Sequence, residues 1–218
     1  MKKLLFFALA PLILTGCQTK PELREDIKKF ISKFSLQVAL EEYKSGGYIS
    51  TKVENSEGKE TKTTITLEYS RIDENHPSYV QVTTILEDDV LTSNVEVSFV
   101  EKDDNYYLST NGELKLSSLA EVNGLITKFF YEKTMIDGQY HVQGYYYGDY
   151  LKEVAPVLQN YVTIDQENEL YEMDYSVTKG DSTMSQNYVV NKFGMLVENH
   201  ITIANEAKSV VQDIYVHN

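Results

Sequence analysis

Cysteine and proline are scarce in this sequence of 218 residues, and each scarcity excludes a class of structure. Cys17 is the single cysteine, so no disulfide can form within the chain and stability has to come from a packed core. Only four prolines are present and low-complexity tracts are absent, which argues against a disordered chain. The abundant residues, 17 tyrosines with many Val, Ile and Thr, favour β-sheet.

The apolar run at residues 4–14 is too short to cross a membrane. As a helix it would not span a hydrocarbon layer of about 30 Å. Two lysines precede the run and the small residues Thr15 and Gly16 follow it, which is the pattern of a secretory signal. We therefore expect residues 1–16 to be a signal peptide that is removed.

The sequence Leu-Thr-Gly-Cys at residues 14–17 resembles a bacterial lipobox. This resemblance implies cleavage before Cys17, a thioether-linked diacylglycerol on its sulfur and, usually, acylation of the new amino terminus. Two or more acyl chains hold a protein stably on a membrane. We expect a lipid-anchored protein on the extracytoplasmic face of the cell membrane. The alternative is a cleaved signal followed by a chance cysteine.

Positive charge is scarce as well. The chain has 20 Lys and Arg residues against 33 Asp and Glu residues, a formal charge of −13. Without the two lysines of residues 1–16, the formal charge becomes −15. Phosphate polymers and anionic headgroups repel such an acidic protein. Nucleic acid is therefore not expected as a partner, and the lipid rather than the protein surface is expected to supply the attachment to the membrane.

The sequence divides into three parts: a signal peptide at residues 1–16, the lipidated cysteine with a short tether at 17–22, and a single α+β domain at 23–218. A tether of five or six residues reaches about 20 Å at most. The domain is therefore expected to lie close to the bilayer.

Three helices are predicted. Apolar residues recur with helical spacing along residues 23–43. A second helix should begin at Ser118, which forms a Ser-x-x-Glu capping box with Glu121, and a third near Asp149.

Elsewhere the apolar residues recur with the period of two that is typical of strands. The alternating segments are 64–70, 80–86, 91–99, 139–147, 171–177, 184–190, 195–203 and 210–216. Short polar turns separate most of them, which indicates antiparallel meanders. The predicted fold class is α+β: a single large curved antiparallel sheet of eight to eleven strands, an incomplete barrel, covered on its concave face by helices.

No catalytic motif is recognisable. The sequence lacks a Gly-x-Ser-x-Gly elbow, a Ser-x-x-Lys pair and a phosphate-binding loop. Four histidines stand far apart without metal-ligand spacing, and the acidic clusters fall where turns are expected. We expect no cofactor, no metal and no enzymatic activity. A hydrolase with two carboxylates brought together by the fold stays open as a third possibility, although the sequence selects no such pair.

An amino-terminal helix, a long one-sided sheet and intervening helices behind a lipobox resemble the lipoprotein-carrier (LolA-like) superfamily. The resemblance implies an incomplete barrel whose concave face holds acyl chains or other hydrophobic ligands. The candidate lining consists of six residues on the apolar side of the last meander: Tyr171, Met173, Tyr175, Met195, Val197 and Ile201.

Two amides, Gln186 and Asn199, fall on the same side as these apolar residues. Buried amides are costly unless they are paired, so these two are expected to bond internally, to lie at a wet rim or to line a partly polar cavity.

Two functions therefore compete. The first is a lipoprotein that binds a lipid, lipopeptide or other hydrophobic ligand without catalysis. The second is an interaction or scaffolding lipoprotein with a filled core, whose acidic surface meets a cationic envelope partner. An apolar cavity of several hundred Å³ between sheet and helices would favour the first function, and a filled interior would favour the second.

Overall fold

The computed structural model describes residues 23–73, 75–136, 139–148, 151 and 162–218. In chain order its elements are α1 (Glu25–Ile31), α2 (Leu36–Glu42), β1 (Ser45–Ser56), β2 (Lys59–Ser70), β3 (Ser78–Glu87), β4 (Val90–Lys102), β5 (Asn105–Thr110), β6 (Glu113–Leu116), α3 (Leu119–Phe130), β7 (Glu132–Ile136), β8 (Gln139–Gln143), β9 (Val162–Asp165), β10 (Leu170–Lys179), β11 (Ser182–Asn191), β12 (Leu196–Ala204) and β13 (Lys208–His217).

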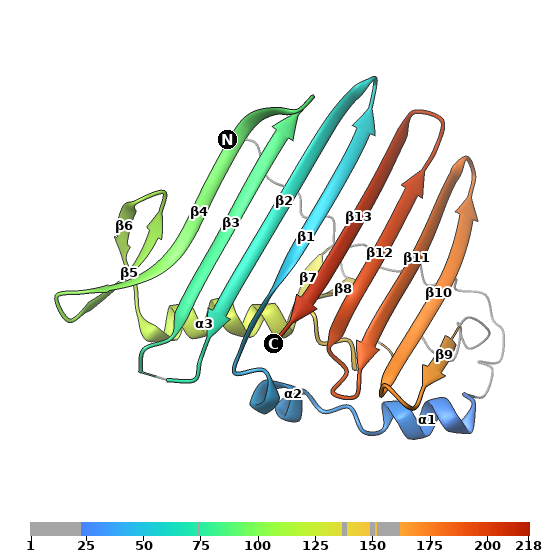
Figure 1. Ribbon diagram of the computed structural model, residues 1–218, viewed down its shortest axis with the longest axis horizontal. Helices are drawn as coiled ribbons and strands as arrows, with labels where there is room; N and C mark the ends of the chain where they lie inside the picture. Colours follow the sequence, from blue (N-terminus) through green and yellow to red (C-terminus); the bar gives the residue numbers. More distant parts are fainter. Residues whose placement is uncertain (1–22, 74, 137–138, 149–150, 152–161) are drawn as a thin grey trace.

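Eleven strands form one open antiparallel sheet, in the order β6-β5-β4-β3-β2-β1-β13-β12-β11-β10-β9 (Figure 1). The first and last strands of the chain, β1 and β13, pair over ten residues at its centre, from Gly47 opposite His217 to Ser56 opposite Lys208. This pairing joins two meanders into a single sheet, which confirms the predicted continuous sheet. The hairpin β7–β8 forms a separate two-stranded sheet.

Tight turns join the strands of the first meander. Asp88 and Asp89, between β3 and β4, both have positive φ, as do Asp103 and Asp104 between β4 and β5. Two central residues with positive φ match the right-handed twist of the flanking strands, and aspartate tolerates this conformation. The acidic clusters are therefore turns at these two places, as predicted.

The helix predicted over residues 23–43 is in fact two helices, α1 and α2. The apolar stripe does continue across the break, because Phe34 is buried along with the inward side of α1. Ser35, however, adopts an extended conformation, and its Oγ accepts a hydrogen bond from the backbone N–H of Val38, 3.5 Å away. A serine that caps a new helix interrupts the old one.

The helix predicted at Ser118 is confirmed as α3. The Ser118 Oγ accepts a hydrogen bond from the backbone N–H of Glu121 over 3.2 Å. The Glu121 carboxylate accepts in turn from the Ser117 hydroxyl, 2.9 Å away, instead of closing the box on Ser118. Most of the helix predicted after Asp149 lies outside the described residues.

Helices α1 and α3 pack on the face of the sheet that carries Tyr48, Leu67, Tyr188 and Ile214. This face is called the helix-side face below, and the opposite face is the outer face. The Phe129 ring of α3 lies 6.2 Å from Tyr48 and 4.8 Å from Tyr69, and α1 contacts Tyr171. These contacts fall near one end of the strands, where Figure 1 also places the helices. None of the described helices is long and apolar enough to cross a membrane.

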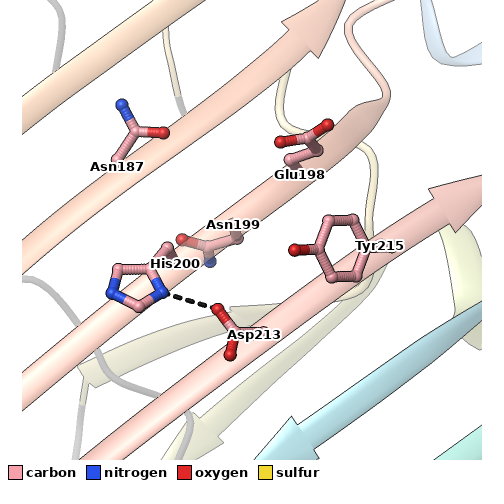
Figure 2. Close-up of a pocket in the computed structure, with 6 residues that line it drawn as sticks. All are labelled: Asn187, Glu198, Asn199, His200, Asp213 and Tyr215. Carbon is pink, nitrogen blue, oxygen red and sulfur yellow. Dashed lines mark hydrogen bonds and ion pairs between the residues drawn. The ribbon is translucent and has the colours of Figure 1, made fainter.

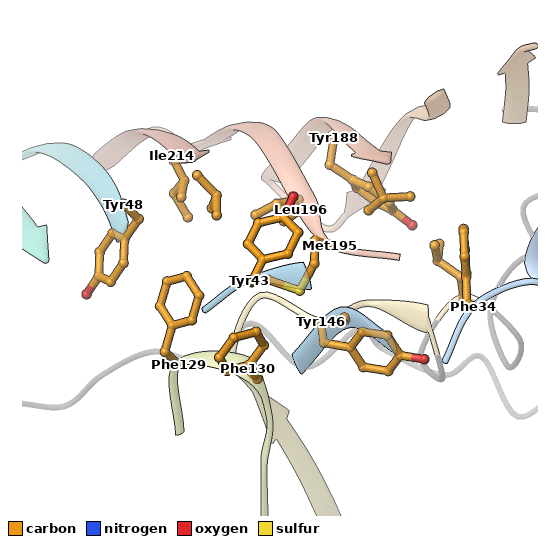
Figure 3. Close-up of a cluster of buried hydrophobic side chains, with 14 of the residues drawn as sticks. Phe34, Tyr43, Tyr48, Phe129, Phe130, Tyr146, Tyr188, Met195, Leu196 and Ile214 are labelled. Atoms are coloured by element: carbon orange, nitrogen blue, oxygen red, sulfur yellow. The ribbon is translucent and has the colours of Figure 1, made fainter. Parts of the chain in front are cut away.

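Aromatic side chains fill the space between these helices and the sheet (Figure 3). Phe130 and Tyr146 are almost completely buried, together with Met195 and Leu196 at the start of β12. The chain after β8 binds α3 closely, because the backbone N–H of Tyr146 donates to the Phe130 carbonyl over 2.9 Å. Gly144 makes this approach possible: its φ is +103°, and a Cβ there would clash with the same carbonyl.

Candidate functional site

Three of the six residues predicted to line a ligand site lie in this packed core. Tyr171, Met173 and Met195 are each 0% exposed. The ring of Phe30 from α1 stacks on Tyr171 with the centroids 5.6 Å apart, and the Tyr188 hydroxyl donates to the Met173 sulfur over 2.9 Å. These three side chains offer no surface to a ligand in this conformation.

The other three predicted residues lie on β10 and β12. Val197 is half-buried, and Ile201 is 7% exposed. Tyr175 pairs with Gln186 across β10 and β11, and Gln186 pairs with Ile201 across β11 and β12. The register therefore brings Gln186 and Ile201 into one row of the helix-side face, with the backbone of Tyr175 at the next position of that row; the side chain of Tyr175 lies outside the described part of the structure.

A β-bulge changes the alternation that was expected on β12. The register between β11 and β12 shifts at Val189 and Val190, so that Val190 pairs with Leu196. Leu196 is 0% exposed, although strict alternation would direct it away from Met195 and the core. Leu196 is therefore a core residue that the sequence pattern did not identify.

The Tyr171 hydroxyl is buried and has no hydrogen-bond partner among the described residues. An unpaired buried hydroxyl costs free energy, while a phenylalanine would fill the same space without that cost. We expect Tyr171→Phe to raise the free energy of unfolding by about 1 kcal/mol, or to leave it unchanged. Chemical denaturation would measure the difference, and a loss of more than about 1 kcal/mol would show that the hydroxyl is paired.

A band of polar side chains crosses the middle of the helix-side face. Gln186 donates from Nε2 to Asn199 Oδ1 over 3.2 Å, and Gln212 donates from Nε2 to Ser50 Oγ over 3.1 Å. Ser50 and Asn199 are both buried. The prediction that Gln186 and Asn199 share the apolar face is confirmed, and of the three environments considered for them the structure has the internal hydrogen bond.

Next to this band lies a charged cluster that the sequence pattern did not identify. Glu54 accepts from Lys52 and from Lys208, each 2.8 Å away. The two ammonium groups lower the pKa of the Glu54 carboxyl. Lys52 and Glu54 follow Tyr48 and Ser50 at a spacing of two, so alternation alone could have placed them on this face.

Apolar side chains continue on the helix-side face along the strands. Ile65, Val97 and Phe99 on β2 and β4, and Met184 on β11, are partly buried and pack against the edge of the core. Ile203 on β12, which pairs with Met184, is half-buried as well. This face is therefore apolar at both sides of the polar band.

The outer face has a small hollow over β11, β12 and β13 (Figure 2). His200 Nδ1 lies 2.5 Å from Asp213 Oδ1, and the Thr202 hydroxyl lies 3.3 Å from His200 Nε2. Glu198 and Tyr215 also line it, but its volume of about 30 Å³ is roughly that of one water molecule. A hydrolase would need room for a substrate beside such a histidine, and this hollow lacks it.

A larger hollow of about 230 Å³ lies between the β1–β2 and β12–β13 turns. Most of its lining is polar, including Glu57, Glu206 and Lys208. Neither of the two hollows lies between the helices and the sheet.

Two further histidines pair with carboxylates at the surface. His76 lies 2.8 Å from Glu101, whose hydrogen bond and negative charge raise the pKa of the imidazole, and His217 lies 3.1 Å from Glu68. Within the described part of the chain, no three His, Cys, Asp or Glu side chains gather as metal ligands would. These histidines occupy turn and strand-surface positions, as the sequence predicted.

The amino terminus matches a known family model. Residues 1–18 match the model described as the prokaryotic membrane lipoprotein lipid attachment site. The chain is a membrane-anchored lipoprotein. Cys17, the only cysteine, lies within the matched residues, so the predicted lipobox is confirmed.

No curated protein matches this lipoprotein. Among solved structures, the crystal structure of LprF from Mycobacterium bovis is similar to it over 90% of this chain and 93% of LprF, with 12% sequence identity and a TM-score of 0.31. At this identity and score, the likeness assigns no role to any residue of this lipoprotein.

Proposed function

We propose that this lipoprotein sits on the extracytoplasmic face of the cell membrane and binds a hydrophobic ligand, such as a lipid or lipopeptide, without catalysis. Residues 1–16 are removed, residues 17–22 tether the lipid on Cys17, and residues 23–218 form one α+β domain. The helix-side face is the concave face of the sheet and carries the ligand. The observation that carries this proposal is the continuation of half-buried apolar side chains along this face, beyond the packed core.

The ligand would lie against the strands beyond the helices. Tyr171, Met173 and Met195 are completely buried in the core, so they would support the ligand site from beneath without contacting the ligand. Of the six predicted residues, Tyr175, Val197 and Ile201 remain as the proposed contacts, with Met184 and Ile203 beside them. The polar band and the Lys52–Glu54–Lys208 cluster would face the polar part of an amphiphile.

One observation favours the second function, a scaffolding lipoprotein with an acidic surface for a cationic partner. The space between the helices and the sheet is filled by aromatic and aliphatic side chains (Figure 3). A filled interior needs no ligand to be stable. The two functions therefore differ in whether the helix-side face takes up an acyl chain.

Ile203→Glu and Thr202→Glu form a matched pair that separates these functions. The two residues are neighbours on β12, both half-buried, on opposite faces of the sheet. The lipidated protein in vesicles would be irradiated with a palmitate that carries a diazirine, and its adducts mapped by mass spectrometry. We expect Ile203→Glu to reduce labelling of β11 and β12 about tenfold, because a carboxylate resists burial against an acyl chain, and Thr202→Glu to leave it unchanged.

Circular dichroism would first establish that both variants are folded. Adducts spread evenly over both faces, or labelling that is equal in the two variants, would exclude the helix-side face as the ligand site. The scaffolding function would then be the better account of the filled core.

A further inference from the structure

The tether places α1 nearest to the membrane. Cys17 precedes Leu23, the first described residue, by six positions, and six extended residues span about 20 Å at most. Leu23 is followed directly by Arg24 and α1. The element closest to the lipid is therefore α1, at the end of the strands where the helices pack (Figure 1).

The outward side of α1 is basic, whereas the protein as a whole is acidic. Two of its cations form ion pairs with neighbouring acids: Lys28 with Glu25 over 2.7 Å, and Arg24 with Asp26 over 2.8 Å. Lys29 remains exposed, and it forms no ion pair with any residue that the structure describes. Ile27, Phe30 and Ile31 are buried on the opposite side, against the core.

Cations from other elements extend this basic side. Lys33, just beyond α1, is exposed, and its charge contributes to lowering the pKa of the Glu169 carboxyl. Lys192, in the turn between β11 and β12, binds the same carboxylate over 2.7 Å. Glu42 of α2 is the other acid whose charge acts on Lys192.

The charges around α1 are therefore more balanced than those of the chain as a whole. Residues 24–33, together with Lys192 and the two acids that act on it, carry five cations against four anions, whereas the mature chain carries 18 cations against 33 anions. The five cations are Arg24, Lys28, Lys29, Lys33 and Lys192, and the four anions are Glu25, Asp26, Glu42 and Glu169.

We infer that the outward side of α1, with Lys29 and Lys33, rests on the anionic headgroups of the membrane that holds the lipid, so that the strands of the sheet point away from the bilayer. A domain with this net negative charge is repelled by an anionic surface, and the tether leaves it no room to avoid that surface. The side of α1 that carries Lys29 and Lys33 is also the side that the tether holds against the membrane. The turn between β1 and β2 then lies roughly 40 Å from the headgroups, because β1 is a strand of 12 residues.

Single cysteines provide the test, because Cys17 is the only natural cysteine and is blocked by lipid. A donor dye would be placed at Ser32→Cys beside α1, or at Glu57→Cys in the β1–β2 turn. The lipidated protein would be reconstituted in vesicles of phosphatidylcholine and phosphatidylglycerol with acceptor dyes on the headgroups. We expect strong energy transfer from residue 32 and several-fold weaker transfer from residue 57. Equal transfer from the two positions would overturn the inference.

Charge reversal tests the role of the lysines. On anionic vesicles, Lys29→Glu with Lys33→Glu should reduce transfer from residue 32 about twofold, since each lysine beside such a surface attracts it and each glutamate is repelled. The matched control is Lys59→Glu with Lys62→Glu, two exposed lysines of β2 at the far end of the strands. The control should leave the transfer unchanged, and on vesicles of phosphatidylcholine alone the two double variants should be equal.

Salt provides a second measurement that needs no variant. High salt screens charges at a membrane surface, so it should lower the transfer from residue 32 of the natural protein on anionic vesicles. If neither high salt nor the charge reversal of Lys29 and Lys33 changes the energy transfer from residue 32, the tether alone sets the orientation. That result would overturn the role of the lysines.

Discussion

Replacing Phe130 with alanine should lower the free energy of unfolding by about 3–5 kcal/mol, the usual cost of deleting a fully buried aromatic ring. Phe130 ends α3 and is 0% exposed. Its ring meets Phe129 at a centroid distance of 5.1 Å and Tyr69 at 5.9 Å, and the guanidinium of Arg71 lies 5.3 Å from its centroid. The variant would therefore leave a cavity at the point where α3 joins the sheet, and urea denaturation would measure its cost.

Phe99 on β4 is the matched control. It is only partly buried, at the edge of the core, and stacks on Tyr106 with the ring centroids 5.5 Å apart. Phe99→Ala should cost less than half as much as Phe130→Ala, because less apolar surface leaves water there. Equal losses for the two variants would mean that the helices add little to the stability of the sheet.

The large sheet follows from local sequence signals. Alternation marks the long strands except β1, which was not predicted, and the turn residues between β3 and β5 fix their hairpins, because aspartate accepts the positive φ that these turns require. Such signals depend on residues that are neighbours in the chain. The pairing of β1 with β13 brings together the two ends of the domain and has no local signal. This pairing could be expected only from a general argument: the free edge strands of two separate meanders would leave backbone groups unpaired, and pairing the two edges removes that cost.

The break between α1 and α2 shows the limit of helical periodicity. The apolar stripe is continuous through Phe34, which is buried like the residues of α1. A stripe reports which residues face the core, and it does not report whether the backbone between them stays helical. The competing signal was Ser35, a good capping residue placed directly before a second helical segment.

The candidate site was predicted only in part, for a similar reason. Alternation places Tyr171, Met173 and Ile201 on one face, and the structure agrees with that placement. Alternation does not say which of them α1 covers, because that depends on packing between residues far apart in the chain. Tyr171 is covered by Phe30, about 140 positions away along the chain.

Raising the pH above 10 should unfold the domain, because buried tyrosines resist ionisation. Burial raises the pKa of Tyr79 from 10.0 to about 12, and it raises the pKa of Tyr69 and of Tyr171 in the same direction. The unfolded chain then loses these protons first, so stability is unchanged below pH 10 and falls as the pH rises toward 12. Tyr79 alone should account for about 2 kcal/mol at the top of this range.

Tyrosinate absorbance and circular dichroism measured along a pH titration would test this, and the absence of tryptophan leaves the absorbance to tyrosine alone. Ionisation of the buried tyrosines should coincide with the loss of secondary structure. Tyr79→Phe keeps the ring but removes the ionisable hydroxyl, which donates to Gln81 over 2.9 Å. That variant should lose about 2 kcal/mol less between pH 10 and 12 than the natural protein. An identical loss in the two proteins would show that Tyr79 ionises freely in the folded state.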